Sequence, residues 1–454
     1  MKMVKSLLLG TAAGLVAMTG AQAADLPVKA KPVQYVKICS LYGAGFYYIP
    51  GTDTCIKVGG WVRMQTQYNV NGSSTNGPFA TNPQNRTVTD YTTRNRAYIT
   101  ADARSQTEYG TLRSYFAAGT SGDNVTAAGG AQNIAASFNR AFVQFAGFTA
   151  GRAISAFDFT NTAVLAYMAG GAMNGGGGQT TGDSGWNVLT YTAQLGNGLT
   201  ANLSVEDARG GNISRYASAG STTIVAAGVG TKMPDFVGNV RIDQSWGSAQ
   251  VMGAIHDASA TYYDAAFAAH PGNKLGYAFG VGAKVNLPML GKGDYIDVMF
   301  AQSKGATRYT SAGVNLQITQ GGQSGNGLNQ DAIYSATAGS NLELTTQWSA
   351  FGGYEHNWNS NWKTSAYGSY VKTQYSDTAN AVINSAANVL LGANANSSQW
   401  QIGSRTAWAP VNNLEVGVDV MYTKLNAANT GSADTSKDAS AWVSQLRVQR
   451  NFYP

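Results

Sequence analysis

The segment IKVGGWVRMQTQYNV, residues 56–70, decides the fold class because its apolar side chains recur at every second position. Successive side chains of a β-strand point to opposite faces, so this segment has one apolar face and one mainly polar face. Strands of soluble proteins run to about five or six residues, and this one is far longer. Length and alternation together indicate a tilted strand that crosses a membrane and extends beyond it at both ends.

The same alternation returns along the chain, and no stretch after the N-terminal region shows a comparably clear helical period. We therefore predict an all-β protein of about sixteen strands. The expected strands are 56–70, 92–104, 110–118, 137–148, 149–154, 186–195, 199–207, 235–244, 248–257, 276–287, 294–304, 341–356, 362–375, 398–408, 413–424 and 441–452.

The connections between these strands alternate in length. Short ones include 196–198, 245–247 and 409–412, whereas the long ones are 71–91, 119–136, 155–185, 208–234, 305–340 and 376–397. An unpaired backbone group in hydrocarbon costs several kcal/mol, so a spanning sheet has no free edge and its first strand must pair with its last. We expect a closed antiparallel transmembrane β-barrel around an aqueous channel, with short periplasmic turns and long extracellular loops.

Composition supports a barrel over a soluble domain. Among 454 residues, 55 are Gly and 24 are Tyr, and only 12% are charged, about half the usual fraction for a soluble protein. The formal net charge of +6 comes without a basic run, so we expect no nucleic-acid partner.

The N-terminal region is typical of an export signal. Lys2 and Lys5 precede an apolar stretch at 7–18, and the triplet 21–23 has the small-x-small pattern of a cleavage site. The alternative, a membrane anchor, needs a longer apolar stretch. We expect a signal peptide at 1–23, an N-terminal periplasmic segment at 24–55 and the barrel at 56–454.

Cys39 and Cys55 are the only cysteines of the chain. An exported protein meets an oxidising compartment, which favours a disulfide between them over the alternative of two free thiols. The bridge would close a short segment rich in aromatic residues.

Aromatic side chains gather in or beside the short connections. Amphipathic rings are stable at the boundary between lipid and water, so we interpret them as a girdle, although any one of them could be ordinary turn packing. They are Tyr109, Phe148, Trp246, Tyr295, Trp358, Trp362 and Trp408.

Charged residues on the polar parity predict the chemistry of the channel wall. The arginines fall mostly on the first five strands and the last, so closure groups them on one arc: Arg63, Arg96, Arg104, Arg113, Arg140, Arg152, Arg405 and Arg447. The acids fall mostly elsewhere: Asp243, Asp297, Glu343, Glu355, Glu415 and Asp419. Opposed charges would set a transverse field across a constriction, whereas the simpler interpretation is that they solvate a wet wall.

Several motifs together resemble the porins of Rhizobiales-type alphaproteobacteria. They are CSLYGAGFYYIPGTDTC at 39–55, IKVGGWVR at 56–63, TEYGTLR at 107–113 and RAFVQFAGFTAGRAISAFDF at 140–159. The resemblance implies a homotrimer in the bacterial outer membrane that passes small hydrophilic solutes and ions by passive diffusion. It also implies that the third long loop, from Ser155, folds into the lumen and brings Phe157, Asp158, Phe159 and Asp183 to the constriction.

Two other functions remain open from sequence. A barrel enzyme would need a histidine base, and His256 beside Asp257 is the best candidate, but no nucleophile motif accompanies it. A surface adhesin would use the long Gly- and Asn-rich loops. Isolated histidines and the cysteine spacing give no metal site, so we expect no cofactor and no metal. Outer-membrane lipid is the expected surrounding of the barrel.

Overall fold

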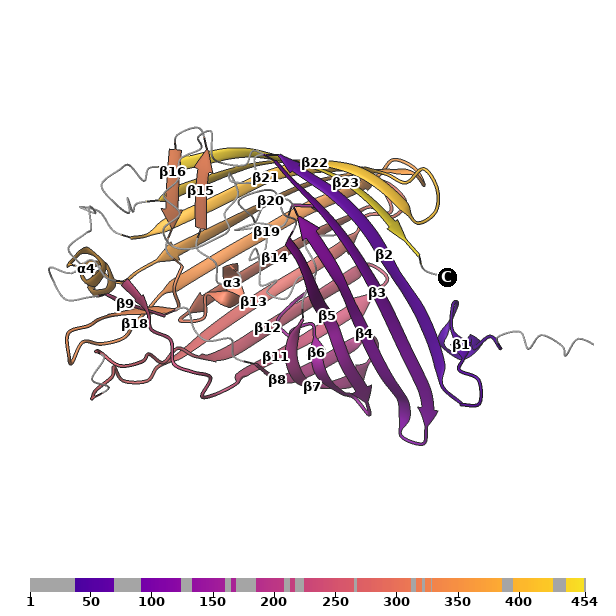
Figure 1. Cartoon of the computed structure of the whole chain (residues 1–454), viewed down its shortest axis with the longest axis horizontal. Helices are drawn as coiled ribbons and strands as arrows, with labels where there is room; N and C mark the ends of the chain where they lie inside the picture. The colour runs from indigo at the N-terminus through magenta and orange to yellow at the C-terminus, as the bar shows by residue number, and fades with distance from the viewer. Residues whose placement is uncertain are drawn as a thin grey trace, which may run out of the picture.

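The structure is a computed structural model that describes residues 37–68, 91–123, 133–159, 165–168, 185–207, 213–216, 224–264, 268–311, 316–320, 323–327, 329–385, 395–427 and 438–452. Within these residues, sixteen strands of one sheet close into an antiparallel barrel (Figure 1). The predicted closed barrel is confirmed. The expected signal peptide, 1–23, lies outside the described residues.

In order around the barrel the strands are β2 (Cys55–Tyr68), β3 (Tyr91–Thr107), β4 (Gly110–Asp123), β5 (Asn133–Phe145), β6 (Phe148–Ala153), β7 (Trp186–Gly196), β8 (Leu199–Glu206), β11 (Asp235–Gln244), β12 (Gly247–Asp257), β13 (Leu275–Asn286), β14 (Tyr295–Lys304), β19 (Thr346–Asn357), β20 (Trp362–Gln374), β21 (Ser397–Trp408), β22 (Leu414–Ala427) and β23 (Ala439–Asn451). Each overlaps one predicted strand. The expected strand 341–356 is shorter as a barrel strand, because β18 (Glu343–Leu344) belongs to a separate sheet.

The barrel closes where β2 pairs with β23, with Trp61 opposite Asn451. The N–H of Phe452 donates to the carbonyl oxygen of Gly60 at 2.9 Å, and its ring packs against that glycine. A Cβ at Gly60 would overlap the carbonyl oxygen of Tyr98 and lie 2.9 Å from Phe452 Cε2. Only glycine therefore fits at this point of the closing seam.

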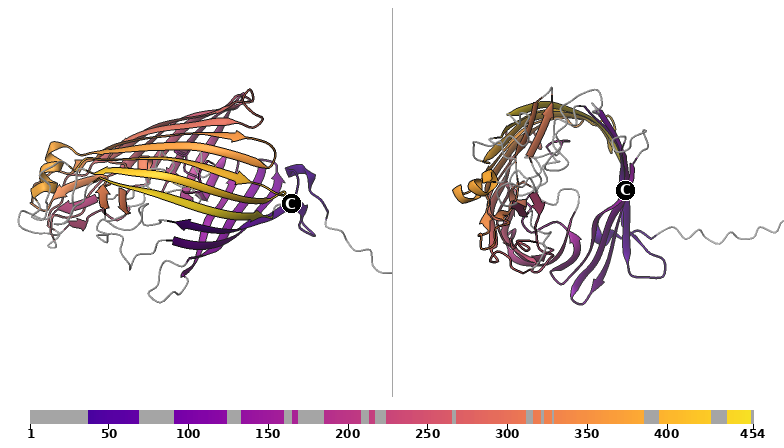
Figure 2. Two further views of the ribbon diagram at one scale, coloured as in Figure 1. Left: turned by 90° about the horizontal axis from the view of Figure 1, so that it is seen from above. Right: turned by 60° about the vertical axis from the view of Figure 1, so that its left-hand side comes forward.

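The two faces of the wall differ as the alternation predicts. Outward side chains such as Leu203 and Phe279 are exposed, as expected for contact with lipid, whereas Met252 and Ala278 point inward and are buried. The right-hand view of Figure 2 looks obliquely along the barrel and shows the strands curving around the interior.

Short turns join the strands at one end of the barrel. At Asn197–Gly198 both residues have positive φ, 51° and 75°, as a two-residue hairpin turn requires. In the turn before β14, Asp294 accepts the N–H of Asn357 (2.8 Å) and the hydroxyl of Tyr354 (2.6 Å), and its Oδ2 lies 2.6 Å from His356 Nδ1. Burial raises the pKa of the Asp294 carboxyl, but these hydrogen bonds outweigh burial and bring the pKa to about 2.

Residues 39–55 form a disulfide-closed segment at the same end of the barrel, which we call the disulfide knot. Cys39 and Cys55 form the predicted disulfide around η1 (Ser40–Tyr42) and β1 (Tyr47–Tyr48), and β1 pairs with β2. Lys57 Nζ donates to the carbonyl oxygen of Ala44 at 3.2 Å and holds the knot against the barrel. Figure 1 places β1 and the C-terminus at one end of the barrel and α4 at the other.

The opposite end carries a cap built from four long loops. Its sheet has the order β10 (Ile224–Ala226), β9 (Ile213–Tyr216), β17 (Ala332–Ser335), β18, and α4 (Asp377–Ser385) packs against β17. Buried side chains of the cap include Tyr334 and Ile383. Among the described residues, no helix is long and apolar enough to cross a membrane.

A second insert lies against the inside of the wall. The hairpin of β15 (Leu316–Gln320) and β16 (Gln323–Gly327) contacts β22 and β23. Met421, Leu425 and Val443 are apolar on the inward parity, and all three are almost completely buried. The hairpin therefore lies over a part of the wall that is too apolar to face water.

Candidate functional site

The constriction loop, residues 154–185, leaves β6 and first binds the wall formed by β8, β11 and β12. The N–H of Ala156 donates to Glu206 Oε1 at 2.8 Å, and Asn239 Nδ2 donates to the carbonyl oxygen of Ala156. Arg241 Nη1 donates to the carbonyl oxygen of Phe159 at 3.2 Å. The predicted folding of this loop into the lumen is confirmed for its described parts, 154–159 and 165–168.

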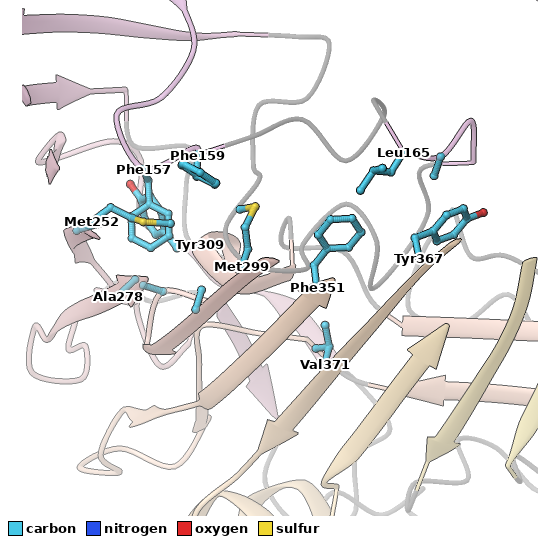
Figure 3. Packing of buried hydrophobic residues seen from close by; sticks show 14 of the residues in the cluster. Phe157, Phe159, Leu165, Met252, Ala278, Met299, Tyr309, Phe351, Tyr367 and Val371 are labelled. Atoms are coloured by element: carbon cyan, nitrogen blue, oxygen red, sulfur yellow. The ribbon is translucent and has the colours of Figure 1, made fainter. Parts of the chain in front are cut away.

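Two aromatic rings fix the first part of the loop. Phe157 is fully buried and packs against Tyr309 of α3 (Arg308–Ser311), with ring centroids 4.8 Å apart (Figure 3). Phe159 lies over Gly282 of β13, where a Cβ would come within 2.6 Å of its ring. Phe157 thus acts as a packing anchor of the loop rather than as part of an open channel wall.

The second described part of the loop binds β22. The N–H groups of Tyr167 and Met168 donate to Asp419 Oδ2 at 2.6 and 3.2 Å. The Tyr167 hydroxyl donates to Glu415 Oε1 at 2.6 Å, and Arg447 Nη2 donates to the Tyr167 carbonyl oxygen at 3.2 Å. The loop is therefore held across the lumen at two separate places on the wall.

Glycines on the wall make room for this second attachment. A Cβ at Gly417 would lie 2.6 Å from Tyr167 Cε2, and one at Gly353 would lie 2.6 Å from Leu165 Cδ1. The lumenal Tyr367 hydroxyl donates to the second oxygen of Asp419. Asp419 is fully buried, so each of its hydrogen bonds is shielded from water.

The wall formed by β2–β5 carries inward arginines, which we call the arginine wall. Its members are Arg63, Arg94, Arg96, Arg104, Arg113 and Arg140, and all are partly exposed. Arg63 is paired across the strands with Arg96, and Arg104 with Arg113. Asp102 bridges the second pair, 2.7 Å from Arg104 Nη2 and 2.9 Å from Arg113 Nη2.

Aromatic rings support several of these arginines, which the sequence analysis did not anticipate. The Arg63 guanidinium lies 4.3 Å from the Trp61 ring centroid, and Trp61 stacks on Tyr98 at 4.6 Å. Arg113 lies 5.1 Å from the centroid of Tyr115, which stacks on Phe142. The feature of the sequence that indicates such a contact is an aromatic residue on the polar face of a strand, two positions from an arginine.

Three predicted residues need correction. Arg152 lies opposite Ala141 and Asn187 and therefore points outward. The pairing of β6 with its neighbours gives it the opposite direction to the predicted one. Tyr295 is buried and lies on the inward face of β14, so it does not join the girdle. Glu343 lies in β18 of the cap rather than in the barrel wall.

The other predicted residues fall as follows. Asp183 lies outside the described residues, and Asp158 borders a lumenal cavity of about 530 Å³ together with Arg140 and Phe159. Arg447 lies on β23 and holds the constriction loop. The girdle candidates with exposed rings are Tyr109, Phe148, Trp246, Trp358, Trp362 and Trp408.

His256, the candidate base of an enzyme, is buried. Its Nδ1 lies 2.7 Å from Asp235 Oδ1, and its Nε2 lies 3.7 Å from Asp331 Oδ2. The Tyr309 hydroxyl also donates to Asp235, at 2.6 Å. This network links barrel strands β11 and β12 to the loop between β14 and β19, so His256 has a structural role.

Comparison with known proteins now gives the family. The family model described as "Porin subfamily" matches residues 25–446. The chain belongs to the porin family. Porin Omp2b of Brucella suis is 35% identical over 258 residues, which are 54% of this porin and 64% of that protein. A putative outer membrane protein of Sinorhizobium fredii, y4fJ, is 37% identical over 152 residues, 32% of this porin and 41% of that protein.

Solved structures share the fold of this porin. The outer membrane channel DcaP of Acinetobacter baumannii matches with a TM-score of 0.61 at 14% identity, covering 89% of this chain and 99% of that one. Salmonella typhi OmpF, solved with daunomycin, matches with a TM-score of 0.51 at 13% identity, covering 88% and 98%. Family and barrel together place this porin in the outer membrane, as the sequence predicted.

Proposed function

We propose that this porin is a general diffusion channel, through which small hydrophilic solutes and ions cross the outer membrane passively. The observation that carries the proposal is the constriction loop, which is attached to β8, β11 and β12 and to β22 from inside the barrel. A loop held across a barrel of sixteen strands narrows the lumen without filling it. Discrete conductance steps in a planar lipid bilayer test the proposal, and the purified, folded protein passing no ions would refute it.

The narrowest part would lie between the arginine wall and the constriction loop. Charges on opposite sides of a narrow aqueous path orient water and dipolar solutes, which disfavours apolar ones. Arg63→Ala and Arg140→Ala should each change single-channel conductance and ion selectivity. If neither variant changes selectivity, the arginines do not act at the constriction.

We propose that the porin is not an enzyme. His256 is 2% exposed and lies between Asp235 and Asp331, and Asp235 also accepts the Tyr309 hydroxyl. A general base must come within hydrogen-bond reach of its substrate, which this enclosure prevents. A hydrolase activity that His256→Ala abolishes would overturn this proposal.

A homotrimer formed through the outward face of β3–β6 completes the proposal. Outward residues there include six alanines beside large apolar side chains such as Ile99 and Phe138, a mixture that leaves hollows which a neighbouring wall can fill. Small side chains let two walls approach closely, and Arg152 could find polar partners in such an interface. The small outward residues are Ala97, Ala101, Ala118, Ala136, Ala141 and Ala150.

The oligomer is tested by size in detergent. Ala118→Trp should convert the trimer to monomers, whereas Val251→Trp on the outward face of β12 should leave it intact. Equal behaviour of the two variants would place the interface elsewhere.

For the N-terminal region, we propose that cleavage after Ala23 leaves residues 24–55 in the periplasm, because the disulfide knot lies at the short-turn end of the barrel (Figure 1).

A further inference from the structure

A shallow groove lies on the outward face of the barrel, across the adjacent strands β14, β19, β20 and β21 (Figure 1). We call it the outward groove, and its volume is about 520 Å³. Its floor is formed by Gly352 of β19 and Gly368 of β20, which lie opposite each other in the register. Ile296, Trp400 and Ile402 border it. Because glycine has no side chain, the surface is recessed between these large apolar groups.

The depth of the outward groove in the membrane follows from its place along β20. Gly368 lies six residues from Trp362, the exposed girdle residue at the short-turn end of that strand. Six residues extend about 20 Å along a strand, which is about 14 Å across the membrane at a tilt of about 45°. The apolar band of such a barrel is about 25 Å tall, so the groove lies near its middle. At this depth its occupant must be apolar.

Two lysines lie at the far edge of the apolar band. Lys372 of β20 and Lys424 of β22 are each ten residues from the start of their strands at the short-turn end. Ten residues gain about 23 Å across the membrane, which brings both ammonium groups to the edge of the band. Both side chains point outward. Among the described residues, the side chain of neither lysine has an ion-pair or hydrogen-bond partner.

The surroundings of the two lysines repeat, since each belongs to a triad with a tryptophan and a tyrosine. In each triad the lysine lies opposite the tryptophan in the register, and the tyrosine two residues before it packs on the same tryptophan. The triads are Trp348–Tyr370–Lys372, with ring centroids 4.9 Å apart, and Trp400–Tyr422–Lys424, with ring centroids 5.3 Å apart. Amphipathic rings are stable at the boundary of lipid and water, so both lysines face lipid headgroups.

The outward groove and the lysines form one continuous surface. Along β20 the distance from Gly368 to Lys372 is four residues, about 13 Å. Trp400 borders the groove and also lies opposite Lys424. An acyl chain that lies in the groove therefore ends beside two cations.

The two ammonium groups suit an anionic headgroup. Lys372 and Lys424 are two strands and two residues apart, roughly 12 Å, so their long side chains can reach one headgroup. Lysine binds phosphate as a compact point charge and needs no fixed geometry to do so. A third lysine at this end, Lys304, borders a pocket together with Glu343 of the cap, so its charge is partly balanced.

We propose that the outward groove binds one lipid of the outer leaflet, with an acyl chain over Gly352 and Gly368 and a phosphate headgroup held by Lys372 and Lys424. The tryptophan of each triad separates the wet headgroup from the apolar groove. The site lies outside the lumen, so this inference goes beyond the proposed channel function and is tested without conductance.

The test measures by mass spectrometry how much lipid the purified porin binds in detergent at low ionic strength. Phosphatidic acid and phosphatidylcholine with the same acyl chains are titrated separately, and the native porin should bind phosphatidic acid more tightly. A lysine near a membrane surface contributes about fivefold to binding of an anionic lipid, so Lys372→Gln with Lys424→Gln should weaken binding of phosphatidic acid roughly 30-fold.

A second variant fills the groove without removing a charge. A Cβ at Gly352 would have Val298 Cγ1 as its nearest neighbour, at 3.7 Å, so the backbone accepts a side chain there. Gly352→Leu should weaken binding of both lipids, because its side chain occupies the place of the acyl chain. Its matched control is Gly253→Leu on the outward face of β12, where a Cβ would lie 3.7 Å from the Ala278 carbonyl oxygen.

The matched control for the lysines is Lys292→Gln with Arg450→Gln, which removes two exposed charges from the short-turn end. Both controls should bind the two lipids as the native porin does. Equal binding of the two lipids by the native porin overturns the proposal, and so does an equal loss in a variant and its control. A change of oligomer size in Gly352→Leu would assign the groove to a second copy of the chain and would also overturn it. Heat-modifiable mobility in gels verifies that each variant has folded.

Discussion

Replacement of Asp419 by alanine tests how the constriction loop is held. The buried carboxylate accepts the N–H groups of Tyr167 and Met168 at 2.6 and 3.2 Å. A hydrogen bond to a charged group contributes about 1.5–3 kcal/mol. Counting each of the two bonds at the lower limit of this range gives about 3 kcal/mol for the attachment. This loss lowers the ratio of attached to released loop by roughly 150-fold.

Single-channel recording measures the consequence. A released loop leaves the lumen wider, so Asp419→Ala should show excursions to higher conductance that occupy far more of the recording than in the native channel. Asp419→Asn keeps one acceptor oxygen and should show a smaller effect. Asp53→Ala, on an exposed turn of the disulfide knot, is the matched control. A folded Asp419→Ala channel with native conductance and native noise would show that the loop does not depend on this attachment.

Three further predictions concern stability. Gly60→Ala should strongly hinder closure of the barrel, because the added Cβ overlaps the Tyr98 carbonyl oxygen; the folded fraction in gel-shift assays reports it, and native yield would contradict it. Cys39→Ser opens a disulfide loop of sequence separation 16 and should destabilise the knot by about 3 kcal/mol, which limited proteolysis should detect as faster cutting before β2, with an unchanged cutting rate as the contrary result. For Asp294 the folded pKa of about 2 lies below the ordinary aspartate value of 3.8, so its stabilisation is complete above pH 3.8 and is lost as pH falls through about 2. Asp294→Asn should therefore be less stable than the native protein at neutral pH, and the gap in denaturant midpoint should close on acidification; a constant gap would exclude this linkage.

The barrel was predictable because one physical rule repeats sixteen times. Each spanning strand must expose apolar side chains to lipid, so even strands with weak propensity keep the two-residue alternation. The ends of the strands were less clear: β4 continues to Asp123, five residues beyond the expected boundary, through small residues that fit a strand or a loop equally well.

The predicted direction of a side chain was wrong where apolar and polar residues do not alternate clearly along the strand. In β6 neither face carries a consistent set of apolar residues, so the charge of Arg152 alone suggests a direction, and it suggests the wrong one. Pairing with β5 and β7, which a single strand does not reveal, sets its direction outward. Tyr295 was assigned to the girdle from its place beside a turn, although its parity already indicated the inward face.

The interior of the channel was only partly predictable. The loop that enters the lumen followed from the family resemblance, but its attachment sites did not, since Tyr167 and Asp419 are 252 positions apart in the sequence. Met421 and Leu425 broke the polar pattern of the inner face, and this was the one hint that a second insert covers them. Likewise β9 and β17 pair in parallel across a long separation that no local pattern encodes.

The shared sheet of the cap affects how this protein responds to cleavage of its loops by a protease. Because β9 and β10 come from one loop, β17 and β18 come from another, and all four strands share one sheet, a protease that cuts either loop between its two strands leaves both new ends held by neighbouring strands. A nicked molecule should therefore migrate as fragments after denaturation while keeping its native outline and its antibody epitopes beforehand.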